Sequence, residues 1–188
     1  GDGEFAIEQL KTALSVNPDF YDAKLKIADI SLANGKYNQA IDNYSALVGV
    51  KDYNDAALKG LANAYFEQAQ VSSSKAFVGS NQDLFKAYDY ISKAVDANNQ
   101  DLELHLAKLK LAKITNQPVA SEVALKEIVG APDGNLVNTV IKGEAYLTLN
   151  DYSNAKKSFD KAVTLAKSIE DKLYLAEILL YQKQYDSA

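Results

Sequence analysis

The sequence predicts an all-α fold, a right-handed solenoid of stacked helix-turn-helix hairpins, and three observations support this prediction. Residues 139–163 contain two apolar stripes at helical spacing, and the turn-forming residues Asn150 and Asp151 lie between them. The small residues Gly143 and Ala155 stand where two helices could cross closely. The same pattern recurs along the chain at the period of a two-helix repeat, roughly 34 residues.

The recurrence is marked by alanines that stand in similar surroundings along the chain. Four of the five intervals between them lie close to the repeat period, and the interval from Ala40 to Ala87 contains extra residues. The marker alanines are Ala6, Ala40, Ala87, Ala120, Ala155 and Ala188. A single hairpin cannot bury both of its faces, so several copies must bury one another. We therefore expect Ala40, Ala87 and Ala155 to be buried at helix crossings.

These residues make the chain resemble the tetratricopeptide repeat family. The pattern of that family has Gly-x-x-Tyr in the first helix of a repeat, Ala-x-x-x-Phe in the second helix, and a closing proline. The matching residues are Gly143 with Tyr146, Ala155 with Phe159, Ala62 with Tyr65, and the closing prolines Pro18 and Pro132. The chain departs from the pattern because it contains no Trp and has Ala124 in the Phe place of its third unit. The resemblance covers essentially the whole chain.

The register of the repeat predicts a single repeat domain over residues 1–188. Its parts are a half repeat at 1–20, a repeat at 21–54, a repeat at 55–101, a degenerate repeat at 102–134, a repeat at 135–168 and a half repeat at 169–188. The chain contains no Met, and it starts and stops within a repeat. We therefore expect it to be a piece of a longer protein.

The helices follow one another in this register. They are expected at about residues 4–16, 21–34, 37–48, 54–68, 82–97 and 170–183, with further helices between 101 and 168. The first helix stops before Pro18, because the residue before a proline disfavours the α conformation. Gly35 is expected to end the second helix as a left-handed cap, and Pro118 is tolerated in the first turn of its helix.

The long interval between markers places an insertion at about residues 69–81, between the two helices of one repeat. A run of serines and Gly79 predict a loop there, with an apolar tip that includes Phe77. Two interpretations remain open for this segment. It either extends a helix and packs Phe77 against its own repeat, or it contacts a partner, since insertions in stacked repeats gather on one face.

Composition excludes several functional classes. The 20 basic residues are all Lys, the acidic residues number 25 and the net charge is −5, whereas a nucleic-acid surface requires clustered Lys and Arg. The chain has no Cys, which excludes disulfides, thiolate catalysis and cysteine zinc sites but allows either a cytoplasmic or an extracytoplasmic location. No apolar run approaches the ~20 residues that a membrane helix needs.

Catalytic groups are similarly sparse. His105 is the one histidine of the sequence, and no phosphate-binding glycine loop or nucleophile elbow is present. The acidic residues around Asp101 lack the glycine and the ligand spacing of a calcium loop, so we expect them to cap helices. The sequence therefore predicts no enzyme, no catalytic or metal site and no cofactor.

The resemblance implies a binding groove lined by the first helices of successive repeats, which receives a peptide or a helix of a partner protein. Transferring the groove positions repeat by repeat gives Leu25, Asp29, Lys59, Asn63, Phe66, His105, Leu109, Val140, Glu144, Leu147, Leu173 and Glu177. Phe66, Leu109 and Leu147 are the expected apolar anchors, and the acids would favour an amphipathic or basic partner. Any of the leucines could instead pack against a neighbouring helix.

The predicted function is therefore a scaffold for protein–protein interaction. One alternative is a structural spacer or regulatory arm of a larger enzyme or assembly. Another is self-association through the last helix, where Leu175, Ile178 and Leu179 would be left uncovered by the end of the chain.

Overall fold

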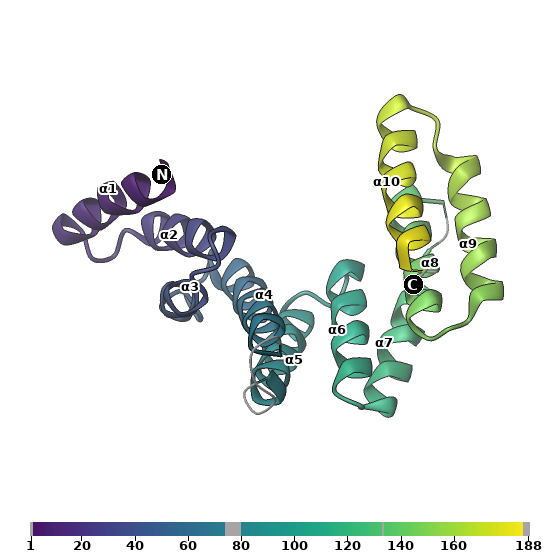
Figure 1. Ribbon diagram of the computed structural model, residues 1–188, viewed down its shortest axis with the longest axis horizontal. Coiled ribbons are helices and arrows are strands. Elements are labelled where there is room, and N and C mark those ends of the chain that lie inside the picture. The colour runs from purple at the N-terminus through teal and green to yellow at the C-terminus, as the bar shows by residue number, and fades with distance from the viewer. Residues whose placement is uncertain (1, 74–79, 133, 186–188) are drawn as a thin grey trace. The chain divides into compact units, whose positions relative to one another are not determined.

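The computed structural model describes residues 2–73, 80–132 and 134–185, and every regular element in these ranges is an α-helix (Figure 1). The predicted all-α fold class is thus confirmed. The chain divides into two compact units, residues 1–100 and 101–188. The boundary between them coincides with the end of the repeat predicted at 55–101, and the single domain expected from the sequence stays a prediction. No described helix is both long and apolar enough to cross a bilayer.

Both units consist of helices that pack in chain order as antiparallel hairpins. The helices of unit 1 are α1 (Asp2–Val16), α2 (Tyr21–Ala33), α3 (Tyr37–Ser45), α4 (Asn54–Ser73) and α5 (Ser80–Ala97). Those of unit 2 are α6 (Leu102–Ile114), α7 (Pro118–Gly130), α8 (Leu136–Thr148), α9 (Tyr152–Leu165) and α10 (Ile169–Tyr185). The first helices of consecutive repeats also touch, because α2 contacts α4 and α6 contacts α8.

Three helices end in the same way, and this fixes the register of the repeat. Gly35, Asn116 and Asn150 follow α2, α6 and α8 and have positive φ values of 69°, 55° and 62°. In each case the next amide donates to the carbonyl five residues earlier, as from Asp151 to Tyr146. This is the hydrogen bond of a left-handed helix cap, so the cap predicted at Gly35 is confirmed. The small residue at the helix crossing follows five residues after each cap, and these residues are Ala40, Ser121 and Ala155.

The structure corrects the register of the third repeat. Its crossing residue is Ser121, with 6% of its surface exposed, and not the marker Ala120, which is only half-buried. The caps Asn116 and Asn150 are one repeat period apart, whereas the interval from Ala120 to Ala155 is one residue longer. The prediction for this repeat was therefore wrong by one residue. Leu125, rather than Ala124, occupies the Phe place.

The crossings are close because glycine or alanine faces an aromatic ring. Gly143 on α8 faces Phe159 on α9, and a Cβ atom added there would lie 2.6 Å from two ring carbons. Gly60 on α4 faces the ring of Tyr44 on α3 in the same manner, at 2.4 Å. The close packing expected around Gly143 is therefore confirmed. Ala40, Ala87 and Ala155 are 0%, 0% and 1% exposed, as predicted.

The insertion is more helical than the sequence suggested. Helix α4 continues to Ser73 and α5 already begins at Ser80, so the ends of the predicted loop belong to helices. Ala69, in the expected loop, is 1% exposed and part of the core. Phe77 lies outside the described residues, and its two interpretations stay predictions.

Each unit buries a core of small, branched and aromatic side chains. The described cluster of unit 1 consists of Ala28, Ala40, Tyr44, Leu61 and Ala64. In unit 2 one cluster consists of Leu106, Leu109, Ala124, Ile128, Ile141 and Ala145, and a second of Val140, Ala155, Phe159, Ala162, Ala166 and Leu175. Leu175 was expected to be left uncovered at the end of the chain, but it is 5% exposed and belongs to this core. Ile178 packs against the same cluster, and the side chain of Leu179 is outside the described set.

Candidate functional site

The candidate site in unit 1 is the surface formed by the first helices α2 and α4, which contact each other. Five predicted groove residues lie on it. Asp29 and Asn63 are exposed, and Leu25, Lys59 and Phe66 are half-buried. Spacings of three and four residues place the members from each helix on one face of that helix. The predicted groove residues of unit 1 thus form a set of accessible polar and apolar side chains.

Asp29 also has a structural role on this surface. The hydroxyl of Tyr44 on α3 donates a hydrogen bond of 2.8 Å to Oδ1 of Asp29. Burial, and then the hydrogen bond to this carboxylate, raise the pKa of Tyr44 well above its ordinary value. The ring of Tyr44 lies in the core beside Gly60, so the hydrogen bond connects the surface carboxylate to the packing of α2, α3 and α4. Asp29 is therefore held in a defined position.

In unit 2 the first helices α6 and α8 are joined by charged side chains. Nζ of Lys110 lies 2.7 Å from Oε2 of Glu144, an ion pair whose members are 49% and 25% exposed. Lys113, one turn further along α6, donates to the backbone carbonyl of Thr148. The partners stand 34 residues apart in the first pair and 35 in the second, close to the repeat period, as expected for side chains on adjacent first helices. Glu144 is thus neutralised by Lys110.

The predicted groove residues of the third repeat are misplaced by the same single-residue error as its marker. Leu109 is 0% exposed and His105 is 5% exposed, so neither side chain is available to a partner. One repeat period before Glu144, the groove position is Lys110 in place of Leu109. Val140 is also 0% exposed and belongs to the core. The sequence signal that would have found Lys110 and Lys113 is the pair of asparagine caps, not the alanine markers.

The remaining groove predictions fall on α8 and α10. Leu147 is half-buried, Leu173 is 59% exposed, and the side chain of Glu177 lies outside the described set. Tyr174, which the sequence analysis did not select, stands near the carboxylates of α6 and α8. Burial, and then the charges of Glu144 and Glu103, raise its pKa.

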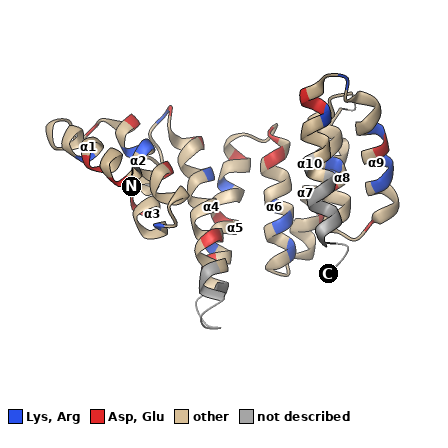
Figure 2. Ribbon diagram, turned by 45° about the horizontal axis from the view of Figure 1, so that its top comes forward, with Lys and Arg blue, Asp and Glu red and all other residues tan. Residues whose placement is uncertain are grey.

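These side chains are suited to binding. Figure 2 shows acidic and basic residues distributed over the helices of both units. Among the described residues, no three His, Asp or Glu side chains gather closely enough to hold a metal ion. The accessible groups offer hydrogen bonds, charge and apolar contact from rigid helices, which suits recognition of another polypeptide.

Comparison with known proteins agrees with this architecture. A model of the tetratricopeptide repeat matches residues 140–169. The chain is similar to the ancillary SecYEG translocon subunit of Aggregatibacter actinomycetemcomitans, with 24% identity over 152 residues that cover 79% of this chain and 74% of that protein.

Two solved structures share the fold. The first is TTC0263, a tetratricopeptide repeat protein of Thermus thermophilus, with a TM-score of 0.67, 22% identity, and coverage of 95% of this chain and 91% of that chain. The second is MamA, with a TM-score of 0.52, 18% identity, and coverage of 94% and 92%. The helix caps, the glycine–aromatic crossings and these matches lead to one assignment. Residues 140–169 match the tetratricopeptide repeat, and the chain has the fold of proteins built from this repeat.

Proposed function

We propose that this protein is an interaction scaffold that binds a segment of a partner protein along its first helices. The observation that supports the proposal is the set of accessible side chains on α2 and α4, where Phe66 offers apolar area and Asp29 and Asn63 offer polar groups. These side chains project from packed helices, so little ordering entropy is lost on binding. A pre-formed surface of this kind suits an extended or helical segment.

The partner chemistry differs between the two units. In unit 1 the exposed carboxylate of Asp29 favours a positively charged group on the partner. In unit 2 the carboxylate of Glu144 is already paired with Lys110, so it contributes little preference for positive charge. The half-buried Leu147 and the exposed Leu173 supply apolar contact there. A basic or amphipathic segment is therefore proposed for unit 1, and an apolar segment for unit 2.

A second candidate function is that of an accessory subunit of a larger assembly. The similarity to a protein named as an ancillary translocon subunit supports this candidate. The two candidates are compatible, because an accessory subunit can recruit its assembly through the same surface. A spacer without specific contacts would instead bind no partner.

The proposal is tested by site-specific photo-crosslinking. A photoreactive amino acid at Asn63 or Leu147 should capture a defined partner, which mass spectrometry identifies. The same group at Lys93 on α5 or Lys156 on α9, both exposed and both on second helices, serves as the control. Capture of the same partner only from the control positions would exclude the first-helix surface.

Two variants then separate effects on the dissociation rate from effects on the association rate. Phe66→Ala should raise the dissociation rate of the identified partner, because apolar anchors supply most of the binding free energy. Asp29→Asn keeps an acceptor for the Tyr44 hydroxyl and removes only the charge, so it should slow association and weaken its salt dependence. Unchanged rate constants in both variants would refute the proposed surface in unit 1.

A further inference from the structure

Two tyrosines stand side by side where the first helices of unit 1 begin. Tyr21 is the first residue of α2, and Tyr53 directly precedes α4. The centroids of their rings are 5.7 Å apart, and the ring planes are inclined at 52° to each other. Both side chains are half-buried, so part of each ring is accessible at this end of the surface formed by α2 and α4.

A carboxylate lies against this pair of rings. The hydroxyl of Tyr53 is hydrogen-bonded to the side chain of Asp22, which follows Tyr21 on α2. This hydrogen bond, and then burial and the charges of Asp22 and Asp52, raise the pKa of Tyr53. The phenol is therefore a neutral donor, which orients the exposed carboxylate and leaves its negative charge in place.

The contact at Asp22 has a counterpart at Asp29. The carboxylate of Asp29 accepts a hydrogen bond of 2.8 Å from the hydroxyl of Tyr44. The two acids are seven residues apart, so they lie on the same side of α2, separated by ~10 Å along its axis. Within the ranges that the structure describes, no lysine forms an ion pair with either of them. Helix α2 thus presents two oriented negative charges.

A lysine of the same helix already uses one of the two rings. Nζ of Lys24 lies 5.3 Å from the centroid of the Tyr21 ring, within the range of a cation–π contact. This contact involves Tyr21 and not Tyr53. Lys24 is therefore an internal competitor for any cation that a partner brings to the pair.

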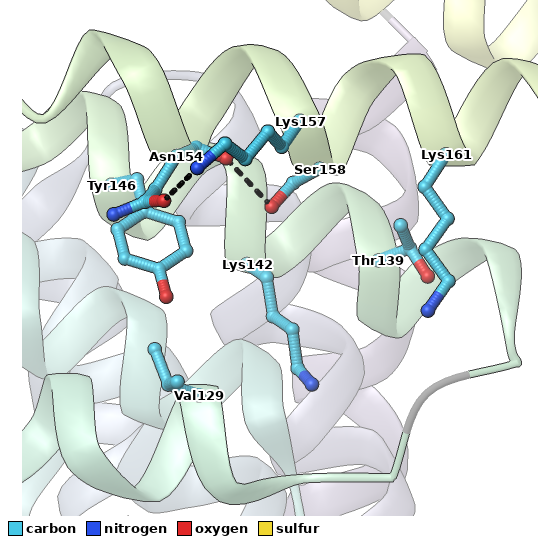
Figure 3. A pocket seen from close by; sticks show the side chains of 8 residues that line it. All are labelled: Val129, Thr139, Lys142, Tyr146, Asn154, Lys157, Ser158 and Lys161. Atoms are coloured by element: carbon cyan, nitrogen blue, oxygen red, sulfur yellow. Dashed lines mark hydrogen bonds between the residues drawn. The ribbon is translucent and has the colours of Figure 1, made fainter.

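A tyrosine on a first helix is not sufficient for such a site. In unit 2, Tyr146 on α8 lines a pocket together with Val129 and Lys142 (Figure 3). The described residues that line this pocket include no Asp or Glu. A cation would therefore find a ring but no carboxylate among them, in contrast to the pair in unit 1.

The chemistry of the pair suits a guanidinium group. This group is planar, stacks on aromatic faces and donates to carboxylates, whereas an ammonium group is a compact point charge. We propose that Tyr21, Tyr53 and Asp22 bind an arginine side chain of the partner segment, while Asp29 binds a second basic side chain. The inference rests on the proposed function and specifies the partner of the same surface in unit 1.

The separation of the two acids specifies the spacing of the partner's charges. A distance of ~10 Å corresponds to residues i and i+7 of a helix, or i and i+3 of an extended strand. Lys26 is exposed and stands between the two acids in the sequence, so it disfavours a third positive charge between the first two. The partner is therefore a segment with two separated basic residues and not a continuous basic run.

The spacing is tested by titration of the whole chain with three synthetic peptides, each with two arginines. Two are alanine-based and of equal composition, with the arginines at i and i+7 or side by side. The third is a glycine–serine peptide with arginines at i and i+3. At least one of the spaced peptides should bind about fivefold more tightly than the adjacent one, because it reaches both acids. Equal affinity of all three would refute the two-point site.

Two-dimensional NMR locates the bound arginine. Amide signals of Tyr21, Asp22 and Tyr53 should shift and saturate, and side-chain protons of one arginine should move upfield because they lie over an aromatic ring. Signals of Thr139 and Ser158, which line the pocket of unit 2, are the reference and should stay in place. Without an upfield shift of arginine protons the proposed stacking is wrong.

Matched variants assign the effect to the pair. Tyr53→Leu should weaken binding of the spaced peptide about twofold to fivefold, the loss of an exposed cation–π contact, while Tyr53→Phe keeps the ring and should lose less. Asp22→Asn keeps an acceptor for the Tyr53 hydroxyl and should weaken binding about threefold or more. Asp42→Asn removes the same charge from an exposed position of the second helix α3 and should change the affinity less than about twofold. Equal losses in Asp22→Asn and Asp42→Asn would reduce the effect to net charge and refute the site.

Lys24→Gln provides a test of opposite sign. It removes the competing cation from the ring of Tyr21, so the affinity for the spaced peptide should rise about twofold or more. A fall in affinity would show that Lys24 supports binding and would contradict the proposal.

Failure of this inference is distinguishable from failure of the proposed function. Phe66→Ala and Asp29→Asn test the first-helix surface of unit 1 as a whole, whereas Tyr53→Leu and Asp22→Asn test the tyrosine pair. If the first two variants weaken binding of the crosslinked partner and the second two do not, the arginine site is refuted and the scaffold function stands. If all four weaken it, both are supported.

Discussion

The crossing of α8 and α9 predicts that Gly143→Ala lowers stability, the reverse of the usual effect of this substitution inside a helix. Alanine normally stabilises a helix relative to glycine by ~0.5–1 kcal/mol, because glycine loses more backbone entropy on folding. At this position the new Cβ atom would lie 2.6 Å from Cε1 and Cζ of Phe159 and 2.9 Å from Cε2. The ring must therefore move if the backbone of α8 stays in place.

The magnitude follows from how far the ring can move. Non-bonded carbon atoms rest ~3.5–4.0 Å apart, so Phe159 must retreat by about 1 Å. It is 8% exposed and packs with Ala155 and Ala162, which leave little room. Overpacking of this kind costs ~1–3 kcal/mol, and the helix preference of alanine offsets up to ~1 kcal/mol of it. The expected net loss is up to ~2.5 kcal/mol, with a melting temperature lower by ~2–4 °C for each kcal/mol in a chain of this size.

The assay is thermal unfolding followed by circular dichroism, with Gly130→Ala as the matched control. Gly130 ends α7, and no atom lies within 4 Å of the position its Cβ would take. This control should keep or raise the melting temperature. The double variant Gly143→Ala, Phe159→Leu should recover part of the loss, since a smaller side chain relieves the contact. A rise in melting temperature for Gly143→Ala equal to that of Gly130→Ala would refute the close crossing.

The remaining predictions concern stability and pH. Ala155→Leu should overpack the same crossing and cost ~1–3 kcal/mol in a denaturant titration, and a loss near zero would contradict its burial. Tyr44→Phe should cost ~0.5–1.5 kcal/mol through the lost hydrogen bond to Asp29, and a loss near zero would contradict a stabilising role for this bond. Because the folded protein raises the pKa of Tyr44, its stabilising contribution is complete below pH ~10 and falls as the pH rises further, so stability measured from pH 9 upward should decline less steeply in Tyr44→Phe. Ala69→Lys should destabilise strongly while the exposed neighbour Gln70→Lys should not, and equal effects would show that the end of α4 is unpacked.

The sequence predicted the fold well because small residues at helix crossings are a steric requirement. Only a small residue at positions such as Gly143 and Ala155 admits the ring of Phe159 at this distance, and the spacing of these positions is therefore regular. The same reasoning failed in the third repeat because serine satisfies the requirement as well as alanine does. The alanine pattern selects Ala120, whereas its neighbour Ser121 occupies the crossing. The left-handed cap is the better marker there, since few residues tolerate a positive φ.

The insertion could not be predicted from local composition. Serine and glycine after residue 70 indicate a loop by propensity, but tertiary packing overrides a weak propensity. Ala69 is buried within unit 1, and α4 and α5 continue along each other to Ser73 and from Ser80. A pair of helices that already packs gains contacts with each added turn, which favours longer helices on both sides of the insertion. How far α4 and α5 extend into the predicted loop therefore depends on tertiary contacts, which a local stretch of sequence does not contain.

Correction of the register also changes the expected charge of the first-helix surface in unit 2. The alanine markers place Leu109 at the groove position that corresponds to Glu144, which predicts an apolar and acidic surface. With Lys110 in that place the acid is paired, and Lys113 adds a second positive charge that contacts the carbonyl of Thr148. An exposed pair of this kind contributes only ~0.2–1 kcal/mol to stability, so its main effect is on the charge that the surface presents. We therefore propose selection for positive charge in unit 1 alone, on the surface that carries Asp29.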